Sequence, residues 1–162
     1  MSDPSGSRAV LVRAADAEVL ASDPASVISL LADTTDTGGA LTSNRSLLRD
    51  GTAGAPPHYH AASEELFFVL GGALRMLLGE DVVTLTEGDF LLVPRGLPHA
   101  FAPAPGQDAD ILVVFVPGTA RFDYYRLLDR VHRGEATWQD VADSQERFDN
   151  HYVASPHWPV PA

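Results

Sequence analysis

Short apolar runs alternate with turn residues along most of this chain. Between residues 9 and 118 the runs recur roughly every 8 to 12 positions and are separated by Gly, Pro and Asp. They span residues 9–12, 27–31, 40–48, 65–70, 73–78, 82–85, 90–93, 99–101 and 111–116. Many short strands at regular spacing are typical of an all-β sandwich or barrel, not of βαβ units. Within residues 73–78, strand alternation places Arg75 outward and Met76 toward the core.

The pattern becomes helical after Pro117-Gly118. Residues 121–132 carry Phe122, Tyr125, Leu128 and Val131 at near-helical spacing. Thr137 can cap a second helix that runs to about residue 147. We expect a poorly ordered segment at residues 1–8, a barrel at 9–118, and helices with an irregular tail at 119–162. The helices are too short to form a domain alone, so they should pack on the barrel.

The composition excludes several kinds of chemistry. The chain has 162 residues, enough for one domain with a sizeable core. It contains no cysteine, which excludes disulfides, thiolate metal sites and a cysteine nucleophile. All 11 basic residues are Arg, so a Schiff-base lysine and a P-loop lysine are impossible within this chain. The net charge of -11 repels polyanions, so we expect no nucleic-acid partner.

Neither a membrane span nor a targeting segment is expected. Residues 1–4 offer no basic region followed by an apolar stretch. The longest apolar runs, such as 111–116, have the length of a strand and are too short to cross a bilayer. We therefore expect a cytoplasmic protein that does not bind membranes.

Three of the six histidines form a pattern with a pair of adjacent glutamates. His58 and His60 are separated by one residue, so on a strand both side chains leave the same face. Glu64 and Glu65 follow at the start of an apolar run, and His99 begins a later one. Three imidazoles and one carboxylate that converge inside a barrel would suit a divalent transition metal. Such a set leaves coordination positions open, as a catalytic site requires.

The spacing of these residues resembles the two motifs of the cupin superfamily. In the first, His58-Tyr59-His60 is followed by four residues, Glu65, six residues and Gly72. In the second, Gly88 is followed by five residues, Pro94-Arg95-Gly96, two residues and His99. The resemblance covers residues 40 to 117, and a weaker likeness to small single-domain cupins of the quercetin 2,3-dioxygenase-like kind extends into the C-terminal helices.

The resemblance implies a jelly-roll β-barrel whose metal is held by His58, His60, Glu65 and His99. Glu64 also fits the first motif, but only one of two adjacent strand residues can face inward. We select Glu65, because it shares a phase with Phe67 and Val69 that matches the family's pattern. The metal could be Fe, Mn, Ni, Co, Cu or Zn, since all accept His and Glu ligands.

Three functions are consistent with this resemblance. The first is a quercetinase-like dioxygenase that uses O₂ on an enolisable aromatic or polyketide-like molecule, with Glu65 as ligand and general base. The second is a metal-dependent isomerase, cyclase, lyase or decarboxylase, and the third is a non-enzymatic binding barrel.

Candidates for the pocket wall are aromatic or flexible apolar residues, which could equally be core: Phe67, Met76, Phe101 and Phe115. A homodimer is expected, because runs 9–12 and 27–31 could pair with a neighbour's sheet.

Overall fold

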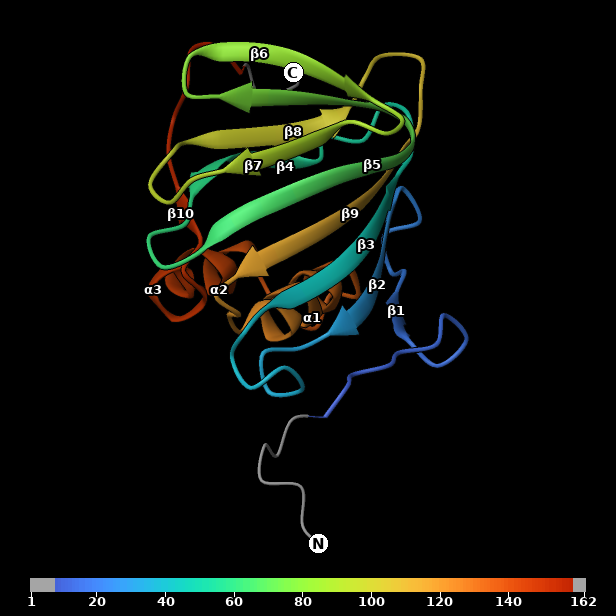
Figure 1. Cartoon of the computed structure of the whole chain (residues 1–162). Helices are drawn as coiled ribbons and strands as arrows, with labels where there is room; N and C mark the ends of the chain where they lie inside the picture. Colours follow the sequence, from blue (N-terminus) through green and yellow to red (C-terminus); the bar gives the residue numbers. More distant parts are fainter. Residues whose placement is uncertain (1–7, 159–162) are drawn as a thin grey trace, which may run out of the picture.

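The computed structural model describes residues 8–158, which form ten strands and three helices (Figure 1). The strands are β1 (Glu18–Leu20), β2 (Ser26–Ala32), β3 (Thr42–Leu48), β4 (Ala55–Tyr59), β5 (Glu64–Leu78), β6 (Asp81–Thr86), β7 (Phe90–Val93), β8 (His99–Pro103), β9 (Ala109–Val116) and β10 (His151–Tyr152). The helices are α1 (Arg121–His132), α2 (Trp138–Asp143) and α3 (Gln145–Phe148). The prediction of an all-β fold with short C-terminal helices is confirmed. Residues 1–7, most of the segment expected to be poorly ordered, and residues 159–162 lie outside the described part.

Strand β5 joins two sheets. Its first half pairs with β7 and β9, and its second half pairs with β6 and β8. The strand order is β1-β2-β3-β9-β5-β8-β4-β10, with β6 and β7 attached to β5 alone. The end strands β1 and β10 do not pair with each other, so the sheet is curled but not closed. Arg75 is half-buried and Met76 is fully buried, as the alternation predicts.

The prediction of a turn at Gly71-Gly72 is wrong, because β5 runs through both glycines. Its pairing with β9 shifts register between Val69 and Gly71, which marks a bulge. Gly72 has a φ of +71°, and its backbone lies so close to Asp108 that a Cβ would sit 1.9 Å from that carbonyl oxygen. The two glycines therefore bend one strand from the first sheet into the second, a common role of bulged glycines.

The edges of the sheet also differ from the predicted pattern. Residues 9–12 form no strand and are exposed, whereas β1, β4 and β10 were not predicted as strands. Strand β4 contains Pro56 and Pro57, which in the sequence indicate a turn. Its pairing with β8 shifts register, and proline is tolerated in such irregular pairings. Strand β10 pairs with β4, so the tail is not wholly irregular.

Residues 27–31, which we expected to be able to pair with a neighbour's sheet, do not lie at an edge. Strand β2, which contains them, pairs with β1 on one side and β3 on the other. The exposed edge on this side of the sheet is β1. The homodimer remains a prediction, and any sheet-to-sheet contact here would have to use β1 or the exposed side chains of residues 9–12.

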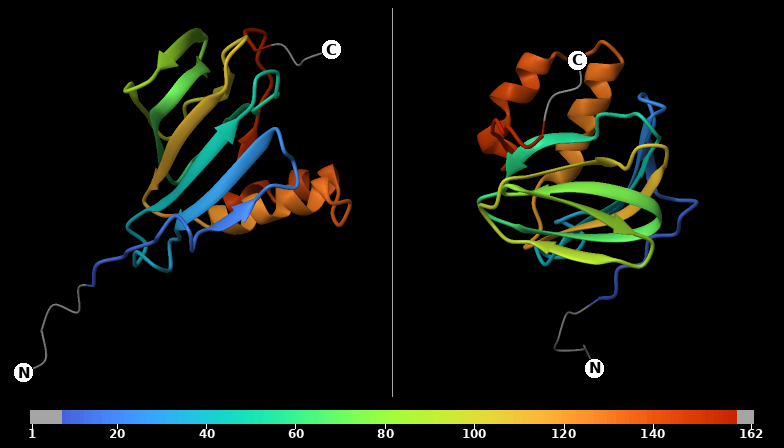
Figure 2. Two further views of the ribbon diagram at one scale, coloured as in Figure 1. Left: turned by 90° about the vertical axis from the view of Figure 1, so that its right-hand side faces the viewer. Right: turned by 90° about the horizontal axis from the view of Figure 1, so that it is seen from above.

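The C-terminal helices pack on one side of the strands (Figure 2). Helix α1 has the predicted bounds, and Thr137 caps α2 in a capping box with Asp140. The predicted second helix is divided at Ser144 into α2 and α3. An apolar cluster that joins α1, α2 and α3 to β2 includes Leu30, Phe122, Leu127, Val141 and Phe148. A separate cluster fills the space between the two sheets. None of the helices in residues 8–158 is long and apolar enough to cross a bilayer.

Candidate metal centre

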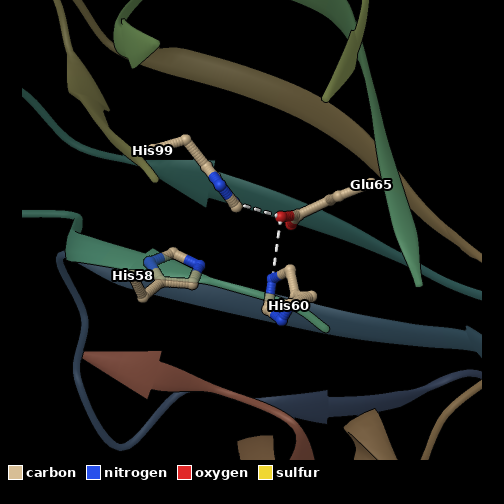
Figure 3. A group of neighbouring side chains, drawn as sticks. All are labelled: His58, His60, Glu65 and His99. Atoms are coloured by element: carbon tan, nitrogen blue, oxygen red, sulfur yellow. Dashed lines mark hydrogen bonds and ion pairs between the residues drawn. The ribbon is translucent and has the colours of Figure 1, made fainter. Parts of the chain in front are cut away.

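Two paired strands and the start of β5 bring the four predicted ligands together (Figure 3). His58 on β4 lies opposite His99 on β8 in the strand register, and His60 follows directly after β4. Glu65 is the second residue of β5. The four side chains are at most 3% exposed, and one candidate ligand atom from each lies within 4.8 Å of the others. Glu64, the neighbour that also fitted the motif, is not part of this cluster.

Each histidine is oriented by a hydrogen bond from Nδ1 to a backbone carbonyl. The acceptors are Pro56 for His58 at 2.7 Å, Asp149 for His60 at 2.6 Å and Leu97 for His99 at 2.9 Å. Such bonds fix the ring orientation and leave Nε2 to face the centre of the cluster. These bonds orient all three rings, and His60 and His99 point Nε2 at Glu65, so that Nε2 could bind a metal once its proton is lost.

Asp149 links the C-terminal helices to this cluster. Its carbonyl orients His60, and its carboxylate accepts hydrogen bonds from the backbone N–H groups of Ala61 and Ala62, each at 2.8 Å. The residue ends α3 in the left-handed conformation, with φ of 51°. The helices thus help to hold the loop between β4 and β5 in place.

The carboxylate of Glu65 is the single acidic group of the cluster. Its Oε2 lies 3.1 Å from Nε2 of His60 and 2.6 Å from Nε2 of His99. Burial alone would raise the pKa of Glu65, but the hydrogen bonds from both histidines hold that pKa well below its usual range. Burial would lower the pKa of His99, but the hydrogen bond to Glu65 outweighs it and raises the pKa. Burial and the neighbouring histidines hold the pKa of His58 well below its usual value, so this imidazole is neutral.

This donor set suits a divalent transition-metal ion. Three imidazole nitrogens and one carboxylate oxygen converge from four directions in a buried site, a ligand combination typical of Fe, Mn, Co, Ni, Cu and Zn. The backbone bonds at Nδ1 are the outer-shell contacts that metal-binding histidines ordinarily make. Four protein ligands leave room for a substrate in a five- or six-coordinate ion.

Metal affinity should depend on pH through His99. A metal ligand must be deprotonated, and the raised pKa of His99 means that a proton competes with the metal at this nitrogen. We expect affinity for Zn²⁺ or Mn²⁺ to fall by about tenfold for each pH unit below that pKa, and to level off above it. Competition titrations with a chromophoric chelator between about pH 5.5 and pH 8.5 would measure this. An affinity that stays constant across the range would contradict the proposed ligand role of His99.

A cavity of about 570 Å³ opens beside the cluster, within the range of small-molecule sites. It lies between the helices α1 and α2 and strands of both sheets, among them β2 and β3 of the first and β4 and β8 of the second. His58 and Glu65 contribute to its wall, so a molecule in the cavity would lie next to the ligand set. The other lining residues are mainly apolar and include Leu48, Leu128 and Val141.

The structure places only Phe101 of the four predicted pocket residues on this wall. Phe67, Met76 and Phe115 are fully buried in the apolar cluster between the sheets. The physical reason is that side chains fill the inside of a small barrel, so the open space lies at its uncovered side, beneath the helices. Phe67, Met76 and Phe115 therefore belong to the core, and other residues of the barrel strands, such as Leu48 and Glu65, share the wall with Phe101.

Several residues of the cavity wall were not identified from the sequence. They come from the C-terminal region: Arg121, Tyr124, Tyr125, Trp138, Asn150, Tyr152 and Trp158. The near-helical spacing of residues 122–131 predicted that one face of α1 is buried, but not that a cavity lies under it. Nothing in the sequence distinguishes Arg121 from the ten other arginines.

Comparisons with known proteins agree with this architecture. Residues 45–115 match the family model described as the cupin domain. No curated protein matches the sequence. The fold is similar to KdgF from a Halomonas species, at 17% identity and a TM-score of 0.61, over 71% of this chain and 99% of that one. It is also similar to the polyketide cyclase RemF from Streptomyces resistomycificus, at 20% identity and a TM-score of 0.59, over 77% of this chain and 98% of that one.

A third similar structure is the hydroxypropylphosphonic acid epoxidase from S. wedmorenis. It shares 23% identity and a TM-score of 0.56, over 65% of this chain and 58% of that one. At these identities the likeness shows the fold and not the activity. The domain match and the shared fold support the cupin superfamily, as the two sequence motifs predict.

Proposed function

We propose that this cupin-fold chain is a metal-dependent enzyme, and that it acts as a dioxygenase of the quercetinase-like kind. Its substrate would be an enolisable aromatic or polyketide-like molecule. The observation that carries the proposal is the position of Glu65 and His58, which belong to the ligand cluster and also line the cavity of about 570 Å³. A molecule bound in that cavity would meet the ligand set from one side.

A divalent transition metal held by His58, His60, Glu65 and His99 would supply Lewis-acid and redox chemistry at the cavity wall. The residues of the chain would provide the rest. Burial shields most of the cluster from bulk water, and the three carbonyl contacts keep the imidazoles in fixed orientations. The apolar wall would bind the body of the substrate.

Glu65 is the residue placed to take a proton from the substrate. Its carboxylate lies on the cavity wall, and its depressed pKa keeps it ionised at neutral pH. A carboxylate base takes the proton of an enol or phenol O–H more readily than that of a C–H bond, so an enolisable aromatic substrate suits this residue.

Removal of oxygen tests the dioxygenase proposal. We expect metal-loaded protein to consume O₂ in the presence of a flavonol, to stop when the solution is made strictly anaerobic, and to resume when O₂ is readmitted. An oxygen electrode together with product chromatography would measure the rate and the ratio of O₂ to product. Undiminished turnover without O₂ would exclude a dioxygenase.

A non-oxidative enzyme is the second candidate. The same cluster and cavity would suit a cyclase or another Lewis-acid enzyme, and the fold covers 98% of the polyketide cyclase RemF. Turnover that requires metal but not O₂ would support this candidate. Tight retention of a small molecule with no product would instead support a non-enzymatic binding barrel.

A further inference from the structure

Arg121 is a buried cation on the cavity wall. It is the first residue of α1, and only 4% of it is exposed. Its guanidinium carbon lies 4.7 Å from the ring centroid of Phe115, 4.2 Å from that of Tyr124 and 5.1 Å from that of Tyr125. These cation–π contacts hold the guanidinium among three rings.

The polar contacts of Arg121 are incomplete. Its Nη1 donates to Oδ1 of Asn150 at 3.2 Å, but its Nε has no hydrogen-bond partner in the described part of the chain. Nδ2 of Asn150 is likewise without a partner there. Buried donors are seldom left unpaired, since each costs free energy without an acceptor. Both residues line the cavity, so an acceptor from a bound molecule could satisfy them.

Arg121 also lacks a close counter-charge. Among residues 8–158, no carboxylate lies within 4.0 Å of its guanidinium. The carboxylate of Glu65 acts on it at longer range and contributes to a raised pKa, although burial opposes this. A divalent ion and the guanidinium of Arg121 would together carry three positive charges, and the carboxylate of Glu65 carries one negative charge. With the ion bound, these groups would therefore have a net charge of two positive. An anion in the cavity would balance them.

Apart from Glu65, the acidic residues of the cavity wall are Asp23 and Asp129, and both are engaged elsewhere. Asp129 accepts a hydrogen bond from the backbone N–H of Ser22 and lies 3.6 Å from Nε of Arg133. Asp23 accepts one from the backbone N–H of Ala25 and lies 3.9 Å from Nε2 of His132. Neither forms an ion pair with Arg121, so they leave the buried guanidinium free to bind an anion.

We propose that Arg121 and Asn150 bind an anionic oxygen of the ligand, a carboxylate or an ionised enol, while the apolar wall holds its body. The cavity therefore selects acidic aromatic or polyketide-like molecules over neutral ones of the same shape. That this ligand is a substrate rests on the function proposed above. The preference for an anionic ligand requires neither a metal nor turnover. Arg121 is on this account a specificity-determining residue.

Two fluorescent probes of nearly the same shape test this preference in the metal-free full chain. Anilinonaphthalene sulfonate carries a negative charge, and phenylnaphthylamine lacks the sulfonate. Both tryptophans of the chain, Trp138 and Trp158, line the cavity, so energy transfer to a probe reports its binding, and the variants below show whether it binds at this site. We expect the charged probe to bind about 10- to 100-fold more tightly than the neutral one.

The variants identify the residue responsible. Arg121→Gln should abolish the preference and leave the affinity for the neutral probe unchanged. Arg126→Gln, which removes an exposed arginine of the same helix that pairs with Glu18, should retain the preference. Asn150→Asp is a second variant with almost unchanged shape. Its carboxylate would pair with Arg121, so the charged probe should bind at least about tenfold more weakly.

Equal affinity of the wild-type protein for both probes would overturn the inference. It would also be overturned if folded Arg121→Gln and Asn150→Asp proteins kept the wild-type preference. The proposed enzyme activity is not needed for any of these results. An intact preference without metal-dependent turnover would reject only the function proposed above, and turnover without the preference would reject only this inference.

Discussion

Replacement of Glu65 by Gln should lower the turnover number by at least about 100-fold, the usual range for loss of a general base. The amide cannot take a proton, and it is a weaker metal ligand than a carboxylate. The readout is flavonol-dependent O₂ uptake at saturating metal, with the metal content of each sample measured. Metal-loaded Glu65→Gln protein with full turnover would show that Glu65 is not the base.

Glu64 provides a matched control for this experiment. It is the adjacent residue of the same strand, carries the same side chain and lies outside the ligand cluster. Glu64→Gln should therefore retain most of the wild-type turnover and metal content. Equal losses in both variants would point to a general effect on β5 and not to chemistry at Glu65.

Substitution of Gly72 by Ala should destabilise the fold by at least about 2 kcal/mol. The new Cβ would sit 1.9 Å from the carbonyl oxygen of Asp108, and a positive φ of 71° is unfavourable for alanine. Urea unfolding of the metal-free protein, followed by tryptophan fluorescence, would give the change in free energy. The bend of β5 requires this glycine, so the effect reports on the junction between the two sheets.

Gly71→Ala is the corresponding control. The nearest atom to its new Cβ, Cβ of Asp110, would be 3.9 Å away, which is an ordinary van der Waals distance. We expect its free energy of unfolding to change by less than about 1 kcal/mol. If Gly72→Ala were no more destabilising than Gly71→Ala, the close approach to Asp108 would not be a constraint on the fold.

The local apolar pattern predicted most of the strands but not their connections. Periodicity located β2, β3 and β6 to β9, because half-buried strands alternate and end at turn residues. It divided β5 at Gly71-Gly72, since a pair of glycines indicates a turn unless contacts distant in sequence are known. It missed β1, β4 and β10, because proline and strands of only two or three residues give no periodic signal.

The ligand cluster was predictable and the cavity was not. The four ligands follow fixed spacings in two short motifs, so a resemblance in sequence is enough to select His58, His60, Glu65 and His99. The cavity depends on how α1 and α2 pack across the open side of the sheet, which no local spacing describes. Arg121 is visible as a candidate only once its burial, its three aromatic neighbours and its unpaired Nε are known.

Elemental analysis of tag-free protein tests the central claim, that these four residues hold a metal. Wild-type protein should contain about one divalent transition-metal ion per chain, and a His58→Ala/His99→Ala variant should contain essentially none. A His132→Ala/His157→Ala variant removes the same number of histidines from outside the cluster and should keep the wild-type content. Wild-type protein that binds no metal even after reconstitution, or a His58→Ala/His99→Ala variant that binds as much as wild type, would contradict the account.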